Sequence, residues 1–317
     1  MAENKRILIF SHRSDIDGMG PIVLSKLAFD EVIYYLCEKS DIAEHITTSG
    51  KTGELYEADY VFVTDIAITE KELNLLNDER IQGKVRVFDH HKASLEIDTT
   101  KYPFVTARFE DEKGKCSGTS LFYEYLLSKQ YLNKTAVVED FVELIRRYDT
   151  WEWKQYQDET PRDLTLLFEC LGPDKFIETF THKLTGDSQN FLIKFSDEEM
   201  ALINYKKKDI AHKVEQYAKQ IIQLEIADTK VGVVFSAYEY RNEIADYLKQ
   251  IDYDIDIVML ASIDKGTYSL RPIKDGADIE PVAKHIGDGA QAVTASGPIT
   301  KETFGKMARV LTRIPFE

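Results

Sequence analysis

The sequence predicts an α/β protein with two domains: a parallel-sheet domain, a helical linker, and a smaller α/β domain. Three short apolar segments, RILIF (6–10), YVFVT (60–64) and KVRVF (84–88), alternate with helix-like stretches near the N-terminus. A second alternation of strand and helix begins after residue 226. The length of 317 residues also exceeds what one hydrophobic core usually organises.

The first domain is expected over residues 1–195. Apolar residues at helical spacing fall between the strand-like segments, at 21–29 and 70–76. Two further helices are predicted at 119–131 and 135–148. Because strands that alternate with helices usually pair in parallel, we expect a sheet covered by helices on both faces.

The linker is expected over residues 196–226 and the second domain over 227–317. Ser196 begins an S-D-E-E sequence, and Glu199 completes a capping box ahead of apolar residues at helical spacing. The strands and the helix expected beyond the linker are VGVVF (231–235), a helix at 242–250, IDIVML (255–260) and TYSLRP (267–272).

The composition is typical of a globular protein from a reducing compartment. Apolar residues make up 43% and charged residues 30%, and no apolar run approaches the roughly 20 residues of a membrane span. The N-terminal apolar run ends at Ser11, too early for a signal-peptide core. Cys37, Cys116 and Cys170 form no CxxC pair, which indicates free thiols. We therefore expect a cytoplasmic protein with no membrane partner.

The charge balance limits the kind of partner. Forty basic and fifty-five acidic residues give a net charge of -15. This is the wrong sign for a protein that neutralises the phosphates of long nucleic acid. We expect no long duplex partner, whereas a small anionic substrate held by metal ions fits the charge.

Each of the three N-terminal strands ends in a polar cluster: SHRSDIDG (11–18), TDIAI (64–68) and DHHK (89–92). Ligands of open parallel sheets bind beyond the carboxyl ends of the strands, so these clusters are expected to converge. The residues concerned are His12, Asp15, Asp17, Asp65, Asp89, His90 and His91. Carboxylates and imidazoles without thiolates suit manganese or magnesium, with zinc or cobalt allowed. Two such ions can clamp the attacking and leaving oxygens of a phosphoryl displacement.

Structural roles remain open for each of these residues. An Asp after a strand is often a helix N-cap, and Asp17 before Gly18 could form a turn. Asp65 could cap the helix expected at 70–76, and the two adjacent histidines could be a coincidence. Asp65 nevertheless lies between apolar residues, where an unpaired buried carboxylate would be costly.

These residues resemble the DHH phosphoesterase superfamily. The shared motifs are H-x-x-D-x-D-G (12–18), TDIAI (64–68), the D-H-H triplet (89–91), CSGTSLFYEYL (116–126) and RRYDTW (146–151). The resemblance implies a DHH catalytic domain, a DHHA1-like substrate-binding domain and an active site in the cleft between them.

The resemblance also implies a role for each ligand. His12, Asp15 and Asp65 would hold one divalent ion, and Asp17, Asp65, His90 and Asp149 would hold the other. Asp65 would bridge the two ions, which are expected to be Mn2+, with Mg2+ or Co2+ as alternatives. His91 would contact the substrate phosphate and take part in catalysis. Asp89 would orient His90 through the hydrogen bond that metal-bound histidines commonly need.

The second domain resembles DHHA1 through YSLRP (268–272) and the segment at 277–297. Arg271 would bind a substrate phosphate with two parallel hydrogen bonds, and Gly287 and Gly289 would let backbone amides approach it. The family usually has a histidine in this glycine-rich segment, and GDGAQAVTASG (287–297) has none. Nucleotide recognition is therefore expected to differ from the family pattern.

Within the superfamily, the domain arrangement and the W-E-W after Asp149 most resemble the nano-RNase B type of oligoribonuclease. The implied activity is hydrolysis of short oligonucleotides (nano-RNA) to 5′ mononucleotides. The alternatives are a cyclic or linear dinucleotide, 3′-phosphoadenosine 5′-phosphate, or a catalytically impaired nucleotide-binding regulator. A homodimer is left open. Tyr148, Trp151 and Trp153 are expected to pack in the core ahead of stacking on a base.

Overall fold

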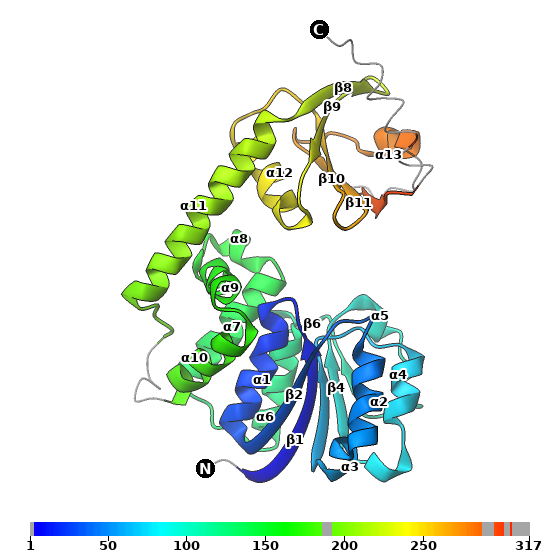
Figure 1. Cartoon of the computed structure of the whole chain (residues 1–317), viewed down its shortest axis with the longest axis vertical. Coiled ribbons are helices and arrows are strands. Elements are labelled where there is room, and N and C mark those ends of the chain that lie inside the picture. The colour runs from blue at the N-terminus through cyan, green and yellow to red at the C-terminus, as the bar shows by residue number, and fades with distance from the viewer. Residues whose placement is uncertain (1–2, 186–191, 287–294, 301–304, 306–317) are drawn as a thin grey trace. The chain divides into compact units, whose positions relative to one another are not determined.

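The computed structural model describes residues 3–185, 192–300 and 305 (Figure 1). The chain divides into two compact units, Met1–Ile203 and Asn204–Glu317. The division falls inside the long helix α11, Asp197–Lys219, which begins where the S-D-E-E sequence predicts it. The Ser196 hydroxyl accepts from the Glu199 amide, and the Glu199 carboxylate accepts from the Ser196 amide.

The first unit contains a five-stranded sheet in the order β2-β1-β3-β4-β5, and every neighbouring pair is parallel. Its strands are β1 (Glu3–His12), β2 (Phe29–Cys37), β3 (Tyr60–Thr64), β4 (Val85–Asp89) and β5 (Val105–Ala107). The three predicted strands are the neighbours β1, β3 and β4. This confirms the parallel α/β sheet.

The sheet is accompanied by a hairpin and a series of helices. The hairpin pairs β6 (Glu110–Asp111) with β7 (Gly114–Lys115). The helices before α11 are α1 (Ile16–Ala28), α2 (Ile42–Thr52), α3 (Glu54–Glu57), α4 (Glu70–Leu76), the short 3-10 helix Glu79–Ile81, α5 (Lys92–Leu95), α6 (Gly118–Ser128), α7 (Ala136–Asp149), α8 (Glu152–Tyr156), α9 (Thr160–Leu171) and α10 (Pro173–Thr185). No helix in the described ranges is both long and apolar enough to cross a membrane.

Helices cover both faces of the first sheet, with α1 and α6 on one face and α2 and α4 on the other (Figure 1). On the α6 face, Phe122 meets Phe62 of β3 at 5.1 Å and Phe88 of β4 at 5.4 Å between ring centroids. These edge-on aromatic contacts fix α6 against the two strands whose ends carry the polar clusters.

Helix α1 is built to receive the start of α6. Pro21 lies inside α1 and has no N–H for the carbonyl of Asp17, four residues earlier. That carbonyl instead accepts from the Thr119 hydroxyl at 2.8 Å. A Cβ on Gly20 would lie 2.2 Å from the same hydroxyl oxygen, so only glycine permits the approach. The D-G-M-G-P sequence therefore joins two helices that lie about a hundred residues apart.

Strand β2 is absent from the sequence-based assignment. It follows α1 without a loop and forms the edge of the sheet, where most of its residues are only partly buried. An edge strand loses the continuous apolar pattern that identifies buried parallel strands. The order places β1 between β2 and β3, so the strand after β1 is added on one side of it and the later strands on the other. Open α/β sheets bind ligands at such a change in strand order, here between β1 and β3.

The second unit has a mixed five-stranded sheet in the order β12-β11-β10-β9-β8, in which only β9 and β10 are parallel. The elements beyond α11 are β8 (Ile222–Ile226), β9 (Thr229–Phe235), the 3-10 helix Tyr238–Tyr240, α12 (Arg241–Gln250), β10 (Ile257–Ser262), β11 (Thr267–Pro272), α13 (Glu280–Ile286) and β12 (Ala295–Pro298). Residues 222–226 were expected to belong to the helical linker but form strand β8. Their alternation of exposed and less exposed side chains is typical of an edge strand.

Candidate metal centre

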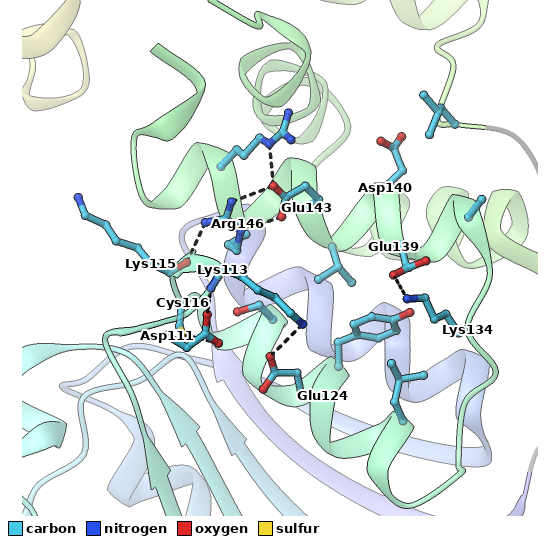
Figure 2. A pocket seen from close by; sticks show the side chains of 17 residues that line it. Asp111, Lys113, Lys115, Cys116, Glu124, Lys134, Glu139, Asp140, Glu143 and Arg146 are labelled. Atoms are coloured by element: carbon cyan, nitrogen blue, oxygen red, sulfur yellow. Dashed lines mark hydrogen bonds and ion pairs between the residues drawn. The ribbon is translucent and has the colours of Figure 1, made fainter. Parts of the chain in front are cut away.

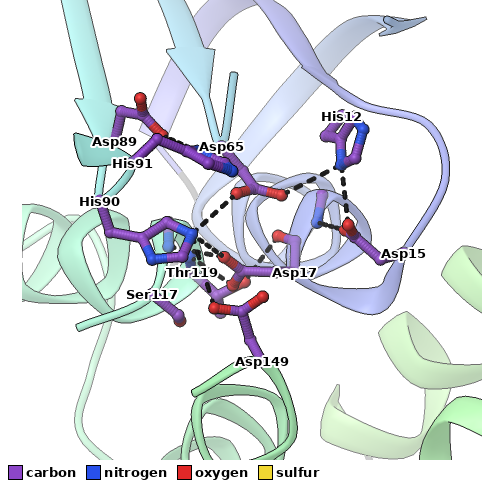
Figure 3. Close-up of polar contacts among 12 residues, drawn as sticks. His12, Asp15, Asp17, Asp65, Asp89, His90, His91, Ser117, Thr119 and Asp149 are labelled. Atoms are coloured by element: carbon purple, nitrogen blue, oxygen red, sulfur yellow. Dashed lines mark hydrogen bonds and ion pairs between the residues drawn. The ribbon is translucent and has the colours of Figure 1, made fainter. Parts of the chain in front are cut away.

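The polar clusters converge at the carboxyl ends of β1, β3 and β4 (Figure 3). Within the described residues, their ligand atoms form three overlapping groups. In each group, all the ligand atoms lie within 4.8 Å of one another. The groups are His12, Asp15 and Asp65; Asp17, His90 and Asp149; and Asp65, Asp89, His90 and His91. The structure thus brings all six predicted metal ligands to one place.

The first group lies toward solvent. His12 Nδ1 is 2.8 Å from Asp15 Oδ2 and 3.5 Å from Asp65 Oδ2. Asp15 is also the N-cap of α1, because its other oxygen accepts from the Gly18 amide at 3.0 Å. The capping alternative is therefore realised for one oxygen of Asp15, while the second oxygen faces the histidine.

The second group is more deeply placed. His90 Nε2 lies 3.3 Å from Asp65 Oδ1, 3.5 Å from Asp149 Oδ2 and 3.8 Å from Asp17 Oδ2. Figure 3 shows the His90 ring pointing at all three carboxylates. Asp17 does not form the reverse turn that the following Gly18 made possible, because it belongs to helix α1. Its carboxylate accepts from the Gly118 and Thr119 amides at 2.7 and 2.9 Å. The start of α6 thus anchors this carboxylate.

Asp65 joins the two groups, because one oxygen faces His12 and the other faces His90. It does not cap α4, where Thr69 and Glu72 form the capping box. Its backbone has a φ of 57°, a left-handed conformation that Asp tolerates better than most residues. A Cβ on Gly118 would lie 2.7 Å from the Cβ of Asp65. The glycine of C-S-G-T-S is therefore what lets α6 approach both Asp65 and Asp17.

Asp89 differs from its expected role. Its carboxylate accepts from His91 Nδ1 at 2.7 Å and from the Ser94 hydroxyl, so the histidine it orients is His91 rather than His90. His91 is 45% exposed, whereas Asp89 is fully buried. The aspartate of D-H-H therefore supports a half-exposed imidazole at the rim of the site.

Asp149 is the last residue of α7, and the nearby Arg146 and Arg147 pair with Glu143. Arg146 Nε and Nη2 donate to Glu143, and its Nη1 donates to the Lys115 carbonyl at 2.8 Å (Figure 2). Its Nη2 also donates to Glu152 at 2.8 Å. The sequence analysis did not predict this structural role of Arg146. It ties the end of α7 to the segment that leads into α6, and so links Asp149 with the amides that hold Asp17.

The electrostatics show an excess of negative charge. Burial and the charge of Asp17 raise the pKa of Asp149 to about 7, and burial raises that of Asp65 well above its usual value. Burial lowers the pKa of His12 and His90, but the neighbouring carboxylates, chiefly Asp15 and Asp65 for His12 and Asp65 and Asp17 for His90, raise it to about 11 and about 10. Without cations, the site favours protons on His12 and His90 and on the carboxyl groups of Asp65 and Asp149.

The residues fit divalent ions. Asp65 Oδ2, His90 Nε2 and Asp149 Oδ2 are buried and make no hydrogen bond. Buried polar atoms without partners are costly, and ion coordination would satisfy all three. The oxygen and imidazole donors, without a thiolate, match manganese or magnesium chemistry.

Another potential ligand group, Cys37, Asp41 and His45, is already satisfied by the protein. The Asp41 carboxylate accepts from the Glu38 amide at 2.7 Å and from Arg13 at 2.9 Å. Burial raises the pKa of the Cys37 thiol to about 12, so a thiolate is disfavoured. We interpret this group as structural.

The first unit also has a cavity of about 670 Å³ beside α6 and α7 (Figure 2). Its charged side chains are largely paired with one another, as in Lys134 with Glu139 at 2.7 Å and Arg146 with Glu143. None of the predicted ligands lines it. The cavity is therefore separate from the metal centre.

In the second unit, Arg271 of β11 lines a pocket of about 370 Å³. Arg241, Tyr238 and Ser269 line the same pocket, and the buried Ser269 hydroxyl makes no hydrogen bond. Burial and the neighbouring Arg241 lower the pKa of Arg271, and the pocket thus brings two guanidinium groups together. Gly287 and Gly289, also predicted to bind substrate, lie outside the described residues.

Comparisons with known proteins agree with the fold. The chain is 30% identical over 299 residues to oligoribonuclease NrnB of Bacillus subtilis, covering 93% of this chain and 73% of the relative. Exonuclease RecJ bound to manganese superposes with a TM-score of 0.52 at 17% identity, over 98% of this chain and 91% of RecJ. The pGpG-specific phosphodiesterase PggH of Vibrio cholerae also gives 0.52, at 16% identity and over 97% of both chains. No family model matches the chain.

The doubly wound sheet, the second sheet unit and the histidine–aspartate cluster at the strand ends, taken with the 30% identity to oligoribonuclease NrnB, define a hydrolase of the DHH phosphoesterase class. Within that class, the chain belongs to the oligoribonuclease NrnB family.

Proposed function

We propose that this chain hydrolyses short oligoribonucleotides to 5′ mononucleotides with the aid of two divalent ions. The observation that carries the proposal is the pair of ligand groups joined through Asp65, in which Asp65, His90 and Asp149 each have a buried atom without a hydrogen-bond partner. The relative in Bacillus subtilis is named an oligoribonuclease, which supports the choice of substrate.

His12, Asp15 and Asp65 would hold one ion, and Asp17, Asp65, His90 and Asp149 the other. Mn2+ is the expected ion, with Mg2+ or Co2+ as alternatives. When bound, the ions would supply positive charge at the attacking and leaving oxygens of the phosphodiester. The carboxylates would bind in their ionised form, so ion binding would release the protons that the crowded site otherwise retains.

His91 would hold a phosphate oxygen at the open side of the site. Its Nδ1 faces the buried Asp89 carboxylate at 2.7 Å, which fixes the orientation of the ring. The side chain is 45% exposed, so the ring would meet a nonbridging oxygen or the leaving sugar oxygen at the rim of the site. Asp89 acts through His91, and His91 acts on the substrate.

Substrate length follows from charge. Fifty-five acidic residues against forty basic ones repel a long polyanion, whereas two ions and a few cationic side chains neutralise two or three phosphates locally. The Arg271 pocket would bind one such phosphate through the planar guanidinium.

The test combines a substrate panel with one variant. The full chain is incubated with Mn2+ and, in turn, RNA of two to five nucleotides, long RNA duplex, a cyclic dinucleotide and 3′-phosphoadenosine 5′-phosphate, and the products are separated by chromatography. We expect 5′ mononucleotides from the short RNA and loss of activity with EDTA. Asp65→Asn should lower kcat/KM by about 10³-fold, because it weakens both ion sites at once.

Asp98→Asn is the matched control, since Asp98 is a carboxylate outside the cluster. Preferred turnover of the cyclic dinucleotide or of 3′-phosphoadenosine 5′-phosphate would replace the substrate assignment. Binding of mononucleotides without any metal-dependent turnover would instead identify a catalytically impaired regulator.

A further inference from the structure

The segment that follows Asp149 exposes two large aromatic rings. Trp151 is 49% exposed and Tyr156 is 61% exposed, at the start and the end of the short helix α8. Trp153 between them is buried and stacks on Tyr148 at 6.2 Å with ring planes 15° apart. Core packing was expected for Tyr148, Trp151 and Trp153; it holds for the buried Trp153, whereas Tyr148 is partly buried and Trp151 is half exposed.

The backbone of Trp151 is held in an unfavourable conformation. Its φ of 65° is left-handed, a region that bulky side chains rarely adopt, and Gln157 after α8 has a φ of 52°. Packing of the ring in a core does not account for this strain, because half of the ring is in solvent. Strained residues cluster at ligand-binding sites, where the surrounding structure enforces the geometry.

Cations lie over both exposed rings. Lys154 Nζ is 4.9 Å from the centroid of the Trp151 ring, and the guanidinium carbon of Arg147 is 5.0 Å from that of Tyr156. Proteins that bind single-stranded nucleic acid combine aromatic rings with cationic side chains. The bases stack on the rings, and the phosphates pair with the cations. Arg147 also pairs with Glu143 at 2.7 Å and with Asp158 at 3.5 Å, which holds its guanidinium beside the Tyr156 ring.

The segment is also close to the metal centre. Trp151 is two residues beyond Asp149, so their Cα atoms lie at most about 7 Å apart. The Trp151 amide donates to the Tyr148 carbonyl at 3.1 Å, which fixes the turn directly after the ligand. The Trp151 backbone is therefore fixed directly beside a residue of the metal centre.

We propose that Trp151 and Tyr156, with Lys154 and Arg147, form a stacking platform for the bases of the substrate, with Trp151 receiving the base nearest the cleaved bond. The inference rests on the proposed oligonucleotide hydrolysis and adds the means by which the site selects nucleotides. The proposal depends on the exposed ring of Trp151. It does not depend on any contact between the two units.

A kinetic experiment separates base stacking from general damage. The substrates are the adenine dinucleotide pApA and the same dinucleotide with both bases removed, each with Mn2+. Trp151→Asn removes the ring and keeps a residue that accepts left-handed backbone. We expect it to lower the ratio of kcat/KM for pApA over the abasic substrate about 10-fold. Trp151→Phe should retain most of the ratio.

Tyr205→Ala is the control, because Tyr205 is an aromatic residue that is 71% exposed on α11. It should leave the ratio unchanged. If Trp151→Asn lowers kcat/KM equally for both dinucleotides, the residue is structural and the platform is wrong. If the wild-type chain hydrolyses neither dinucleotide, the proposed activity is wrong. The stacking platform is then tested by a binding measurement.

Fluorescence provides the binding measurement without turnover. The chain has two tryptophans, so Trp153→Phe leaves Trp151 as the sole indole. With Mn2+ present, AMP should quench this emission and ribose 5-phosphate should not, since only AMP has a base to stack. Equal responses to the two ligands, or none, would overturn the platform whatever the catalytic result.

Discussion

The two ligand groups that meet at Asp65 are built differently. In the first, His12 and Asp15 already satisfy each other through a contact of 2.8 Å, and their side chains are 24% and 37% exposed. In the second, Asp17 is almost fully buried and held by two backbone amides, while His90 and Asp149 keep buried atoms without partners. An ion in the first group must disrupt an existing contact, whereas an ion in the second displaces protons and contacts atoms that have no hydrogen-bond partner.

The comparison teaches that one site has two unequal halves. Preorganised, desolvated ligands bind an ion with little reorganisation, so the Asp17–His90–Asp149 half should bind first and more tightly. The His12–Asp15 half should fill second. The predictions below would break or sharpen this ranking.

The largest effect is expected from removing one ligand of each half in turn. Asp149→Asn should weaken the tighter Mn2+ site by about 100-fold or more, and Asp15→Asn should weaken only the looser one. Isothermal titration with Mn2+ would resolve the two steps in the wild-type chain. The ranking is wrong if Asp15→Asn abolishes the tighter step and Asp149→Asn preserves it.

A smaller effect is expected from Arg146, which touches no ligand directly. Arg146→Gln removes the donors that tie Glu143, Glu152 and the Lys115 carbonyl together, so Asp149 and the amides around Asp17 should lose their alignment. We expect about 10-fold weaker binding of the first Mn2+ ion with little change in the second.

Arg80→Gln is the control, because Arg80 forms an exposed pair with Asp78 outside the site. Electron paramagnetic resonance of the Mn2+-loaded protein would report whether the spin-coupled pair of ions persists. Equal weakening of both ions would show that Arg146 supports the fold in general.

The smallest effect is on the pH dependence of the metal-free protein. The folded pKa of Asp149 is raised from 3.8 to about 7, so protonation favours the folded state. Its contribution to stability is complete below pH 3.8 and is lost as pH rises through 7. With EDTA, Tm should therefore fall between pH 5 and pH 8 by a few degrees, and Asp149→Asn should flatten this part of the curve.

Saturating Mn2+ supplies the control, because ion binding favours the ionised carboxylates and should remove the decline. A rise in the Tm of the metal-free protein over the same interval would contradict the raised pKa. So would an unchanged slope in Asp149→Asn.

Local sequence was sufficient to predict the three central strands and the convergence of the His and Asp clusters that follow them, whereas Asp149 was expected from the family resemblance. Strand and helix periodicity depends on near neighbours, and a carboxylate or imidazole at the end of a buried parallel strand must reach the same edge of the sheet. The capping box at Ser196 was readable for the same reason, since its partners are three residues apart.

The tertiary structure decided how those ligands are held. The amides that bind Asp17 come from residues 118 and 119, about a hundred positions away, and no periodicity reports such a pairing. Packing of α6 against α1 and β3 also selected the left-handed backbone of Asp65 and the close approach of Gly118. Only the fold could show that Asp89 supports His91 and that Trp151 remains in solvent while Trp153 is buried. The sequence alone determined which chemical groups reach the site. Long-range packing determined which of them are satisfied and which are left to bind a ligand.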